Sequence, residues 1–284
     1  AKVICLDSLV SGKKENISNI LPNKNFKFVF GDITNEISLD ANIDEIYNLA
    51  SPASPADYHK LPLETLLCGS LGVKNVLELA RKNDAVFLQA STSEVYGDPL
   101  QHPQKESYYG NVNPIGPRAC YDESKRFAET LTVNYAQKYS LKIRIARIFN
   151  TFGPKMRKDD GRAIPSFIFS AMNNKPVYVF GTGGQTRSFC FITDLRDGLT
   201  KLMASTYSLP VNLGNPDERT ILETAKKIIS FTGSKSKIVF KPYPQDDPAR
   251  RKPDISVAIK ELGWKPVTTF DEGLKKTVEW FGQN

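Results

Sequence analysis

Short apolar runs alternate with longer helical patterns through the first half of the chain, an arrangement typical of a parallel α/β sheet. Five of these runs have the length of buried strands, and polar or turn-forming residues follow them. We predict strands at Lys2–Leu6, Lys27–Phe30, Glu45–Leu49, Val86–Ala90 and Lys142–Ile148.

Two longer segments between these strands are predicted as helices. Leu63–Lys82 has apolar residues at helical spacing, including Leu67, Leu71 and Leu79, and we expect it to cross back over the sheet. Ala119–Tyr139 is predicted as one long helix that leads into the last strand. The pattern therefore indicates a Rossmann-like, doubly wound parallel sheet.

The residue composition and the length of the predicted elements change beyond Asn150. Proline and glycine become frequent, strands shorten, and helices such as Thr220–Thr232 are separated by loops. We predict one α/β domain over residues 1–150 and a smaller C-terminal α/β lobe over residues 151–284, with some exchange of chain between them.

The start of the predicted sheet differs from that of a dinucleotide-binding domain. Such a domain begins with a strand, a glycine-rich turn and a helix, and an acidic residue ends its second strand. Asp7 suits that acidic position, whereas Gly181–Gly184 lies far downstream and lacks the spacing of the turn. We therefore expect the first βα unit to lie outside the given sequence and a gap to be left at the centre of the sheet. We also expect these 284 residues to bind a dinucleotide weakly or not at all.

Composition narrows the class of protein. Of 284 residues, 40% are hydrophobic and 24% charged, so a folded core is expected. The net charge is +7, but the basic residues are scattered, and the densest cluster, Arg250–Lys252, ends at Pro253. We predict no nucleic-acid binding, because a small polyanionic substrate explains a modest positive excess equally well.

Other features bear on location and metal binding. Cys5, Cys68, Cys120 and Cys190 are far apart, which predicts free thiols and a cytoplasmic protein. The two histidines are isolated, so no metal site is predicted. No apolar stretch approaches the roughly 20 residues that span a bilayer, and no signal peptide is expected at Ala1–Asp7.

Tyr121 and Lys125 lie four residues apart in the predicted helix Ala119–Tyr139, so their side chains share one face. A lysine cation there is expected to lower the phenol pKa, and a phenolate can remove a proton from a substrate hydroxyl as hydride leaves its carbon. The same spacing also arises by chance in a chain with 11 tyrosines. Taken alone, the pair leaves a catalytic site and an ordinary helical pair open.

A polar run directly after the predicted strand Val86–Ala90 supports the catalytic interpretation. Thr92 and Glu94 would lie at the carboxyl end of a parallel strand, where such sheets bind ligands. A threonine hydroxyl there can bind the same substrate oxygen as Tyr121. The alternative for each polar residue of the run is helix capping or turn formation.

The sequence resembles the extended short-chain dehydrogenases/reductases, the NAD-dependent epimerase/dehydratase family, over nearly its whole length. Within that family it is most similar to the UDP-glucuronate decarboxylases, or UDP-xylose synthases. The stretches that carry the resemblance are Leu49–Pro55, Ser91–Pro99, Gly110–Gly116, Cys120–Arg126, Arg147–Pro154, Gln185–Phe189 and Arg251–Asp254. It implies NAD as the cofactor of the first domain, a UDP-sugar substrate for the C-terminal lobe, and no membrane partner.

The resemblance also implies a role for each matching residue. Tyr121 is the base at sugar C4, Lys125 holds the cofactor ribose, and Thr92 binds the C4 oxygen. Glu94 and Arg251 orient the sugar carboxylate and manage the proton at C5. The cofactor-binding positions are Asp7, Asp32, Ile33, Ala50, Ser51, Tyr121 and Lys125. The positions that hold UDP are Asn150, Arg162 and Arg187. For the two arginines a surface salt bridge is the alternative.

Ser93 bears on the choice of reaction. Oxidation of a uronic acid at C4 gives a β-keto acid, which loses CO2 without acid catalysis of a leaving hydroxyl. The related 4,6-dehydratases need an acid and have an Asp-Glu pair where this chain has Ser93-Glu94, and a serine cannot act as that acid at neutral pH. The sequence favours decarboxylation of UDP-glucuronate to UDP-xylose. A 4,6-dehydratase, a 4-epimerase and a non-catalytic nucleotide-sugar-binding protein stay open as alternatives.

The resemblance finally implies a homodimer. In the family, the helices that match Leu63–Lys82 and Ala119–Tyr139 pack as a four-helix bundle across a two-fold axis. We expect outward apolar residues such as Leu131 and Tyr135 to lack partners within one protomer.

Overall fold

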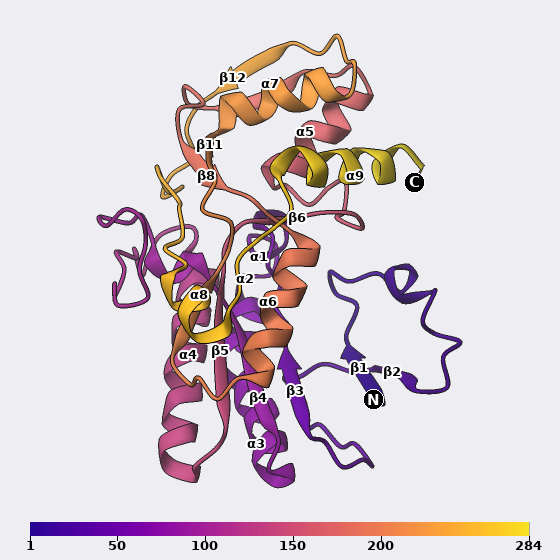
Figure 1. Ribbon diagram of the computed structural model, residues 1–284, viewed down its shortest axis with the longest axis vertical. Helices are drawn as coiled ribbons and strands as arrows, with labels where there is room; N and C mark the ends of the chain where they lie inside the picture. Colours follow the sequence, from indigo (N-terminus) through magenta and orange to yellow (C-terminus); the bar gives the residue numbers. More distant parts are fainter. Residues whose placement is uncertain (284) are drawn as a thin grey trace.

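The computed structural model describes residues 1–283 and shows a layered α/β region joined to a smaller lobe (Figure 1). The layered region is built on a parallel four-stranded sheet, and the last three of the five predicted strands recur in it with small differences at their ends. In spatial order its strands are β10 (Pro210–Leu213), β5 (Ile143–Ile148), β4 (Val86–Thr92) and β3 (Glu45–Asn48).

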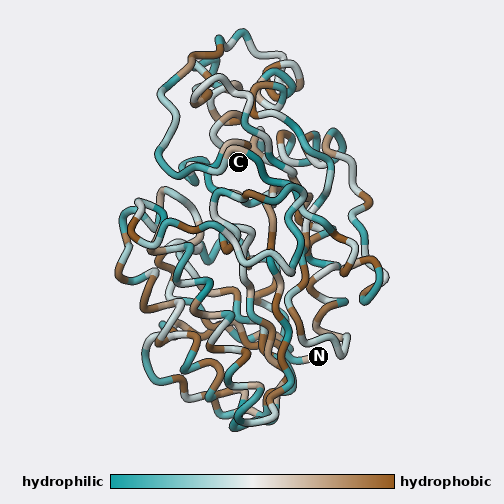
Figure 2. The backbone as a smooth tube through the Cα atoms, turned by 90° about the vertical axis from the view of Figure 1, so that its left-hand side faces the viewer, coloured by the Kyte–Doolittle hydropathy of each residue, from teal (hydrophilic) through white to brown (hydrophobic). Residues whose placement is uncertain are grey.

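Helices cover both faces of this sheet, as the doubly wound pattern predicts. Alternate residues of β4 face opposite cores: Phe87 packs with one and Leu88 with the other. Hydrophobic segments accordingly gather along the interior strands in Figure 2. The covering helices are α3 (Val73–Asn83) and α4 (Ala119–Tyr139) on one face and α6 (Ile192–Ala204) and α8 (Ser256–Leu262) on the other.

The first two strands form a separate sheet. β1 (Val3–Asp7) pairs in parallel with β2 (Phe26–Phe30), and the turn η1 (Lys14–Ile17) lies between them in the sequence. Within residues 1–283, neither strand is hydrogen-bonded to β3, and Figure 1 draws both to the right of it, with β2 the farther. The interruption that we expect in the sheet is therefore found between β1 and β3.

The predicted helix Leu63–Lys82 is not one regular helix. It consists of α2 (Pro62–Leu67), a π-helical turn η2 (Cys68–Gly72) and α3, after a short helix α1 (Pro55–Tyr58). A Cβ atom on Gly69 would lie 2.6 Å from the Cβ of Ser124, so glycine permits the turn to approach α4 closely. The prediction missed this irregularity because close packing between helices is a tertiary effect.

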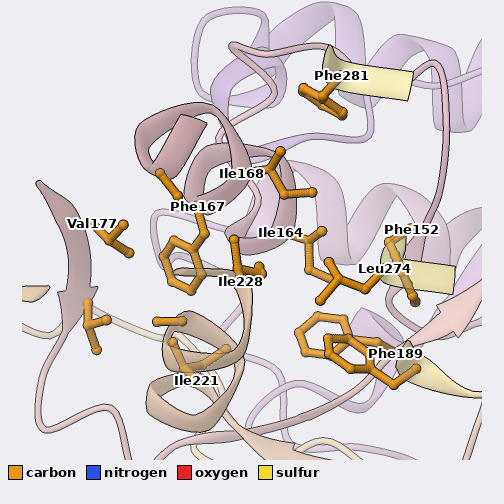
Figure 3. Close-up of a cluster of buried hydrophobic side chains, with 14 of the residues drawn as sticks. Phe152, Ile164, Phe167, Ile168, Val177, Phe189, Ile221, Ile228, Leu274 and Phe281 are labelled. Carbon is orange, nitrogen blue, oxygen red and sulfur yellow. The ribbon is translucent and has the colours of Figure 1, made fainter. Parts of the chain in front are cut away.

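The smaller lobe has its own apolar core, shown in Figure 3. Ile164 and Ile168 contribute to it from α5, Ile228 from α7 and Leu274 from α9. The helix predicted at Thr220–Thr232 is confirmed, and Thr220 caps it through a capping box with Glu223. The elements of the lobe are α5 (Ala163–Met172), α7 (Ile221–Phe231), α9 (Phe270–Gln283), β7 (Val177–Phe180) paired with β12 (Ile238–Lys241), and β8 (Thr186–Ser188) paired with β11 (Glu218–Thr220).

The chain passes between the two regions more than once. It enters the lobe through β6 (Thr151–Phe152) and returns through β9 (Cys190–Phe191) to place α6, β10 and α8 on the large sheet. Residues beyond 150 therefore complete one face of the layered region. No helix among the described residues is long and apolar enough to cross a membrane.

Candidate active site

The carboxyl end of β4 and the first turns of α4 bring the two predicted catalytic motifs together. The side chains of Thr92 and Tyr121 lie next to each other, and the Thr92 hydroxyl accepts the backbone N–H of Glu94 at 3.3 Å. Glu94 lies in the short turn η3 (Ser93–Tyr96), which follows β4 directly. A phenol, a threonine hydroxyl and a carboxylate thus gather at the edge of the sheet where ligands bind in this class of fold.

Lys125 lies one helical turn beyond Tyr121 and is buried. Its Nζ atom donates to the carbonyl oxygen of Ala90 at 2.9 Å and lies 5.8 Å from the centroid of the Tyr121 ring. Burial lowers the pKa of Lys125 to about 8. Because the bond to Ala90 uses one N–H group of the ammonium, the others can bind a ligand hydroxyl.

The expectation that Lys125 lowers the phenol pKa is wrong for this structure. Burial raises the pKa of Tyr121 to about 12, and the adjacent Thr92 hydroxyl and the charge of Arg162 offset only part of that rise. The prediction counted the lysine charge but not the lost hydration of a phenolate, which is the larger effect here.

Glu94 is surrounded by arginines that come from distant parts of the chain. Arg118, the residue before α4, contacts the Glu94 carboxylate at 2.5 Å, and Arg251 contacts it at 3.4 Å. Burial alone would raise the pKa of Glu94, but the charges of Arg251, Arg118 and Arg187 hold it at about 2. Glu94 is therefore ionised at neutral pH, so it can accept a proton but not donate one.

Asp247 extends this network toward the C-terminal lobe. Its carboxylate accepts a hydrogen bond from Arg187 at 2.8 Å and one from Arg118 at 3.5 Å. Arg187 lies on β8, and Arg251 also donates to the backbone oxygens of Ser93 and Gly97. We call these five side chains, Glu94, Arg118, Arg187, Asp247 and Arg251, the Glu94 cluster.

Several buried polar atoms at this cluster have no hydrogen-bond partner. Among residues 1–283, six buried side-chain atoms lack one, and four of them are Tyr58 Oη, Arg118 Nε, Asp122 Oδ1 and Arg251 Nε. Three of these four atoms, Tyr58 Oη, Arg118 Nε and Arg251 Nε, are hydrogen-bond donors that have no acceptor. Unpaired buried donors are costly, so their concentration here points to an oxygen-rich, anionic ligand.

Tyr58 and Asp122 were missed by the sequence analysis. The Tyr58 ring stacks on that of Tyr121, with centroids 5.2 Å apart and an angle of 10° between the planes, and the Arg118 guanidinium lies 5.9 Å from its centroid. Burial and the nearby charge of Glu94 raise the pKa of Asp122 to about 8. The sequence marks Asp122 only by its position next to Tyr121, and Tyr58 only by its place just after the stretch Leu49–Pro55.

Ser93 and the three predicted UDP-binding residues lie in different surroundings. Ser93 is buried, and its hydroxyl faces Glu94 at 3.4 Å. Asn150 follows β5, and its buried Oδ1 atom lacks a partner. Arg162 is paired with Asp160, and its positive charge acts to lower the pKa of Tyr121. Arg187 alone of the three belongs to the Glu94 cluster.

The predicted cofactor residues follow the carboxyl ends of β1, β2 and β3. Asp7 ends β1, and one of its oxygens accepts the N–H of Leu9 at 2.7 Å. Asp32 holds Thr34 through two bonds of 2.8 Å, and the Ile33 side chain packs where a Cβ on Gly72 would meet it. The remaining positions, Ala50 and Ser51, follow β3 and bond to Cys68 and Pro52 respectively.

These positions fit a dinucleotide in part. Ala50 and Ser51 follow β3 and so share one edge of the four-stranded sheet with Thr92, whereas Asp7 ends β1 and Asp32 follows β2 in the separate β1–β2 sheet. Lys125 supplies a buried cation that no carboxylate contacts in the described residues. Its ammonium can therefore donate a hydrogen bond to a ribose hydroxyl. Gly181 and Gly183 lie in the connection between β7 and β8, in the other lobe.

Known protein families and individual proteins are similar to this chain in sequence. A family model described as GDP-mannose 4,6 dehydratase matches residues 2–277. UDP-glucuronic acid decarboxylase 1 of Danio rerio is 48% identical over 282 residues, which cover 99% of this chain and 67% of that protein. UDP-glucuronic acid decarboxylase 3 of Arabidopsis thaliana is 45% identical over 280 residues, which cover 99% and 81%. This chain spans 63 to 67% of the length of the first three such relatives.

Solved structures share the fold. A dTDP-glucose 4,6-dehydratase from Bacillus anthracis, solved in complex with NAD, superposes with a TM-score of 0.86 at 26% identity. The superposition covers 100% of this chain and 88% of that one. The doubly wound architecture predicted from the sequence is thus found in a family of sugar-modifying enzymes.

Proposed function

Because the chain belongs to the GDP-mannose 4,6-dehydratase family, within the extended short-chain dehydrogenases/reductases, we propose that it decarboxylates UDP-glucuronate to UDP-xylose with NAD. One observation carries the choice of reaction. The Glu94 cluster holds more buried positive than negative charge, next to the Tyr121 hydroxyl that would act at sugar C4.

The charges of the cluster can be compared directly. Arg118, Arg187 and Arg251 carry three positive charges, and Glu94 and Asp247 carry two negative ones. Asp122 adds no full charge at neutral pH, because its pKa is raised to about 8. Buried charges require partners, and a sugar carboxylate supplies one anion together with acceptors for unpaired donors. A neutral hexose would supply neither.

The residues then divide the work as follows. Tyr121 and Thr92 bind the C4 hydroxyl, and Tyr121 takes its proton when its own phenol is in the ionised form, which the raised pKa makes a minor one. NAD, when bound, accepts the hydride from C4. Arg118 and Arg251 orient the sugar carboxylate, and Glu94 keeps their charge from holding that group too tightly to leave as CO2. Because Glu94 is ionised, it has no proton to give to C5 after CO2 leaves. That proton comes from water, and the hydride then returns to C4 as Tyr121 gives its proton back to the C4 oxygen.

The cofactor and the nucleotide would be held by different elements. Lys125 is placed to bind the cofactor ribose, with Asp7, Asp32, Ile33, Ala50 and Ser51 along the strand ends toward the adenosine. Asn150, Arg162 and Arg187 would hold the UDP moiety; the unpaired Oδ1 atom of Asn150 supports this. The four cysteines are free, which supports a reducing compartment such as the cytoplasm.

We propose a homodimer through α2 and α4, but with different contact residues from those expected. Leu131 packs against the core of its own protomer, and the Tyr135 hydroxyl donates to Glu78 at 2.8 Å. Leu63, Leu67 and Phe127 are instead at least half exposed on these helices, and Leu71 on η2 is also exposed. Light scattering should give twice the protomer mass, and Leu67→Glu should yield monomer; a wild-type monomer at micromolar concentration contradicts the proposal.

The test of the function is product analysis on the full-length protein. We expect CO2 and UDP-xylose from UDP-glucuronate and no dehydration of dTDP-glucose. Tyr121→Phe should abolish both CO2 release and transient NADH absorbance, because the C4 proton then has no acceptor. Dehydration of dTDP-glucose without CO2 from UDP-glucuronate would favour a 4,6-dehydratase. Binding of UDP-glucuronate without any turnover would favour a non-catalytic binding protein.

A further inference from the structure

A second, partly buried glutamate lies on the same face of α4 as the two predicted catalytic residues. Tyr121, Lys125 and Glu129 follow one another at intervals of four residues, so they form one line along the helix. Each contacts a consecutive part of β4: Tyr121 the Thr92 side chain, Lys125 the Ala90 oxygen, and Glu129 the hydroxyl of Ser91 at 2.5 Å. Three contacts therefore join helix and strand along the line that leads to the site.

Arg147 holds Glu129 from the next strand. Its guanidinium makes a two-pronged contact with the Glu129 carboxylate, through Nε at 2.9 Å and Nη2 at 2.8 Å. The Nη1 atom donates to the Tyr96 hydroxyl at 3.0 Å and to the Glu106 carbonyl at 2.9 Å. A bidentate arginine that is also fixed on its other side has little freedom to move.

The anchors of this pair form a row across the sheet. Ser91 on β4, Arg147 on β5 and Asn212 on β10 are register partners on three adjacent strands. The Tyr96 hydroxyl donates to Asn212 at 2.7 Å and so closes the network. We call Ser91, Tyr96, Glu129, Arg147 and Asn212 the Glu129 cluster. The row lies one residue before Thr92, so it fixes the strand end that carries the site.

We propose that Glu129 is a positioning residue that sets the place of α4 along β4, and thereby the distances of Tyr121 and Lys125 from Thr92 and Ala90. None of its oxygens, and no nitrogen of Arg147, is among the unpartnered buried atoms of the described residues. The cluster therefore has no capacity left for a ligand, and its effect on the reaction is indirect. The effect on turnover rests on the function proposed above.

The experiment compares three variants of the full-length enzyme. Glu129→Gln removes the charge, Ser91→Ala removes only the strand contact, and Glu123→Gln is the matched control on the same helix. Glu123 is a partly exposed residue whose contact with Arg126 measures 3.6 Å. Because a misplacement of about 1 Å can cost about 10²-fold in rate, we expect kcat for CO2 release to fall about 10²-fold in Glu129→Gln and about tenfold in Ser91→Ala. KM for UDP-glucuronate, the affinity for UDP and the control should stay near wild type.

A merely structural role would lower Tm without moving kcat at temperatures where the variant is folded. If Glu129→Gln does not fold, because Arg147 is left buried without its partner, Ser91→Ala decides the matter since it keeps the ion pair. A folded Ser91→Ala with wild-type kcat overturns the proposal. A crystal structure of that variant gives a second measurement, the distance between Lys125 Nζ and the Ala90 oxygen.

The two measurements separate this proposal from the proposed function. If the wild type releases no CO2 from UDP-glucuronate, the proposed function fails, and the crystal structure alone decides the positioning role. A longer distance from Lys125 to Ala90 then supports it, and an unchanged distance overturns it. A lower kcat with α4 unmoved also overturns it, because Glu129 would then act by another route.

Discussion

The Glu94 cluster and the Glu129 cluster each contain a glutamate paired with arginine, and they differ in how completely their polar groups are paired. In each, a glutamate that follows or contacts the carboxyl end of β4 is paired with arginine from another element. In the Glu129 cluster, the one arginine is held by a carboxylate, a hydroxyl and a carbonyl. In the Glu94 cluster, two arginines keep unpartnered Nε atoms.

This difference indicates what each cluster is for. A saturated network adds rigidity, because each donor already has its acceptor and rearrangement would break bonds. An unsaturated one carries a penalty in the free protein that a ligand can remove. Strong electrostatic perturbation alone does not separate the two, since structural ion pairs also shift pKa values. The presence of unpaired donors in the Glu94 cluster does separate it from the Glu129 cluster.

The largest expected effect comes from Glu94→Gln. Removing this charge leaves three arginines opposed mainly by Asp247, so the sugar carboxylate should bind more tightly and leave less readily. We expect CO2 release at saturation to fall about 10²–10³-fold, as for the loss of one positioned electrostatic group, while KM falls or stays unchanged.

The readout of Glu94→Gln is steady-state CO2 release beside UDP binding by calorimetry. Some NADH should still form, because Tyr121 and Thr92 remain in place. Wild-type CO2 release in this variant would remove Glu94 from the proposed mechanism. Read beside Glu129→Gln, it separates a residue that acts on the substrate from one that acts through α4.

Two buried tyrosines give a matched pair of hydroxyl deletions. Tyr58 has an unpartnered hydroxyl, whereas the Tyr96 hydroxyl bonds to Asn212 and Arg147. Tyr58→Phe should leave the free energy of unfolding unchanged or raise it by up to about 1 kcal/mol, yet lower kcat/KM about tenfold, the value of one hydrogen bond. Tyr96→Phe should instead cost about 1–3 kcal/mol of stability, because it strands polar partners.

Chemical denaturation and turnover of both tyrosine variants check this pair. If Tyr58→Phe destabilises the protein as much as Tyr96→Phe, the contrast between the two clusters is wrong. If neither variant changes turnover, Tyr58 does not contact the substrate.

The smallest expected effect is the pH dependence that Asp122 contributes to stability. Its pKa is raised from 3.8 to about 8, mainly by burial, so the folded state keeps a proton that the unfolded state loses. The contribution is fully present below pH 3.8 and is lost as pH rises toward about 8. Asp122→Asn should therefore raise Tm more at pH 8 than at pH 5. Equal shifts at both values would show that the carboxyl is ionised throughout.

Much of the fold follows from local patterns in the sequence. The helix Ala119–Tyr139 has the predicted bounds, and the strands lie where apolar runs predicted them. These features depend on periodic burial along one segment, which a linear sequence displays directly. The Tyr121 and Lys125 pair was likewise visible, because residues four apart in a helix are neighbours in any fold.

Tertiary structure alone decided which groups surround Glu94. Arg118 lies 24 residues from Glu94 in the sequence, and Arg251 lies 157 residues from it. Local spacing in the sequence therefore predicts neither contact. Tyr58 and Asp247 joined the site in the same way. The direction of the Tyr121 pKa was also beyond the sequence, which displays the nearby lysine but not the loss of water around the phenol. Hydration and long-range pairing depend on all of the packed elements at once, whereas helical and strand periodicity depend on neighbours in the chain.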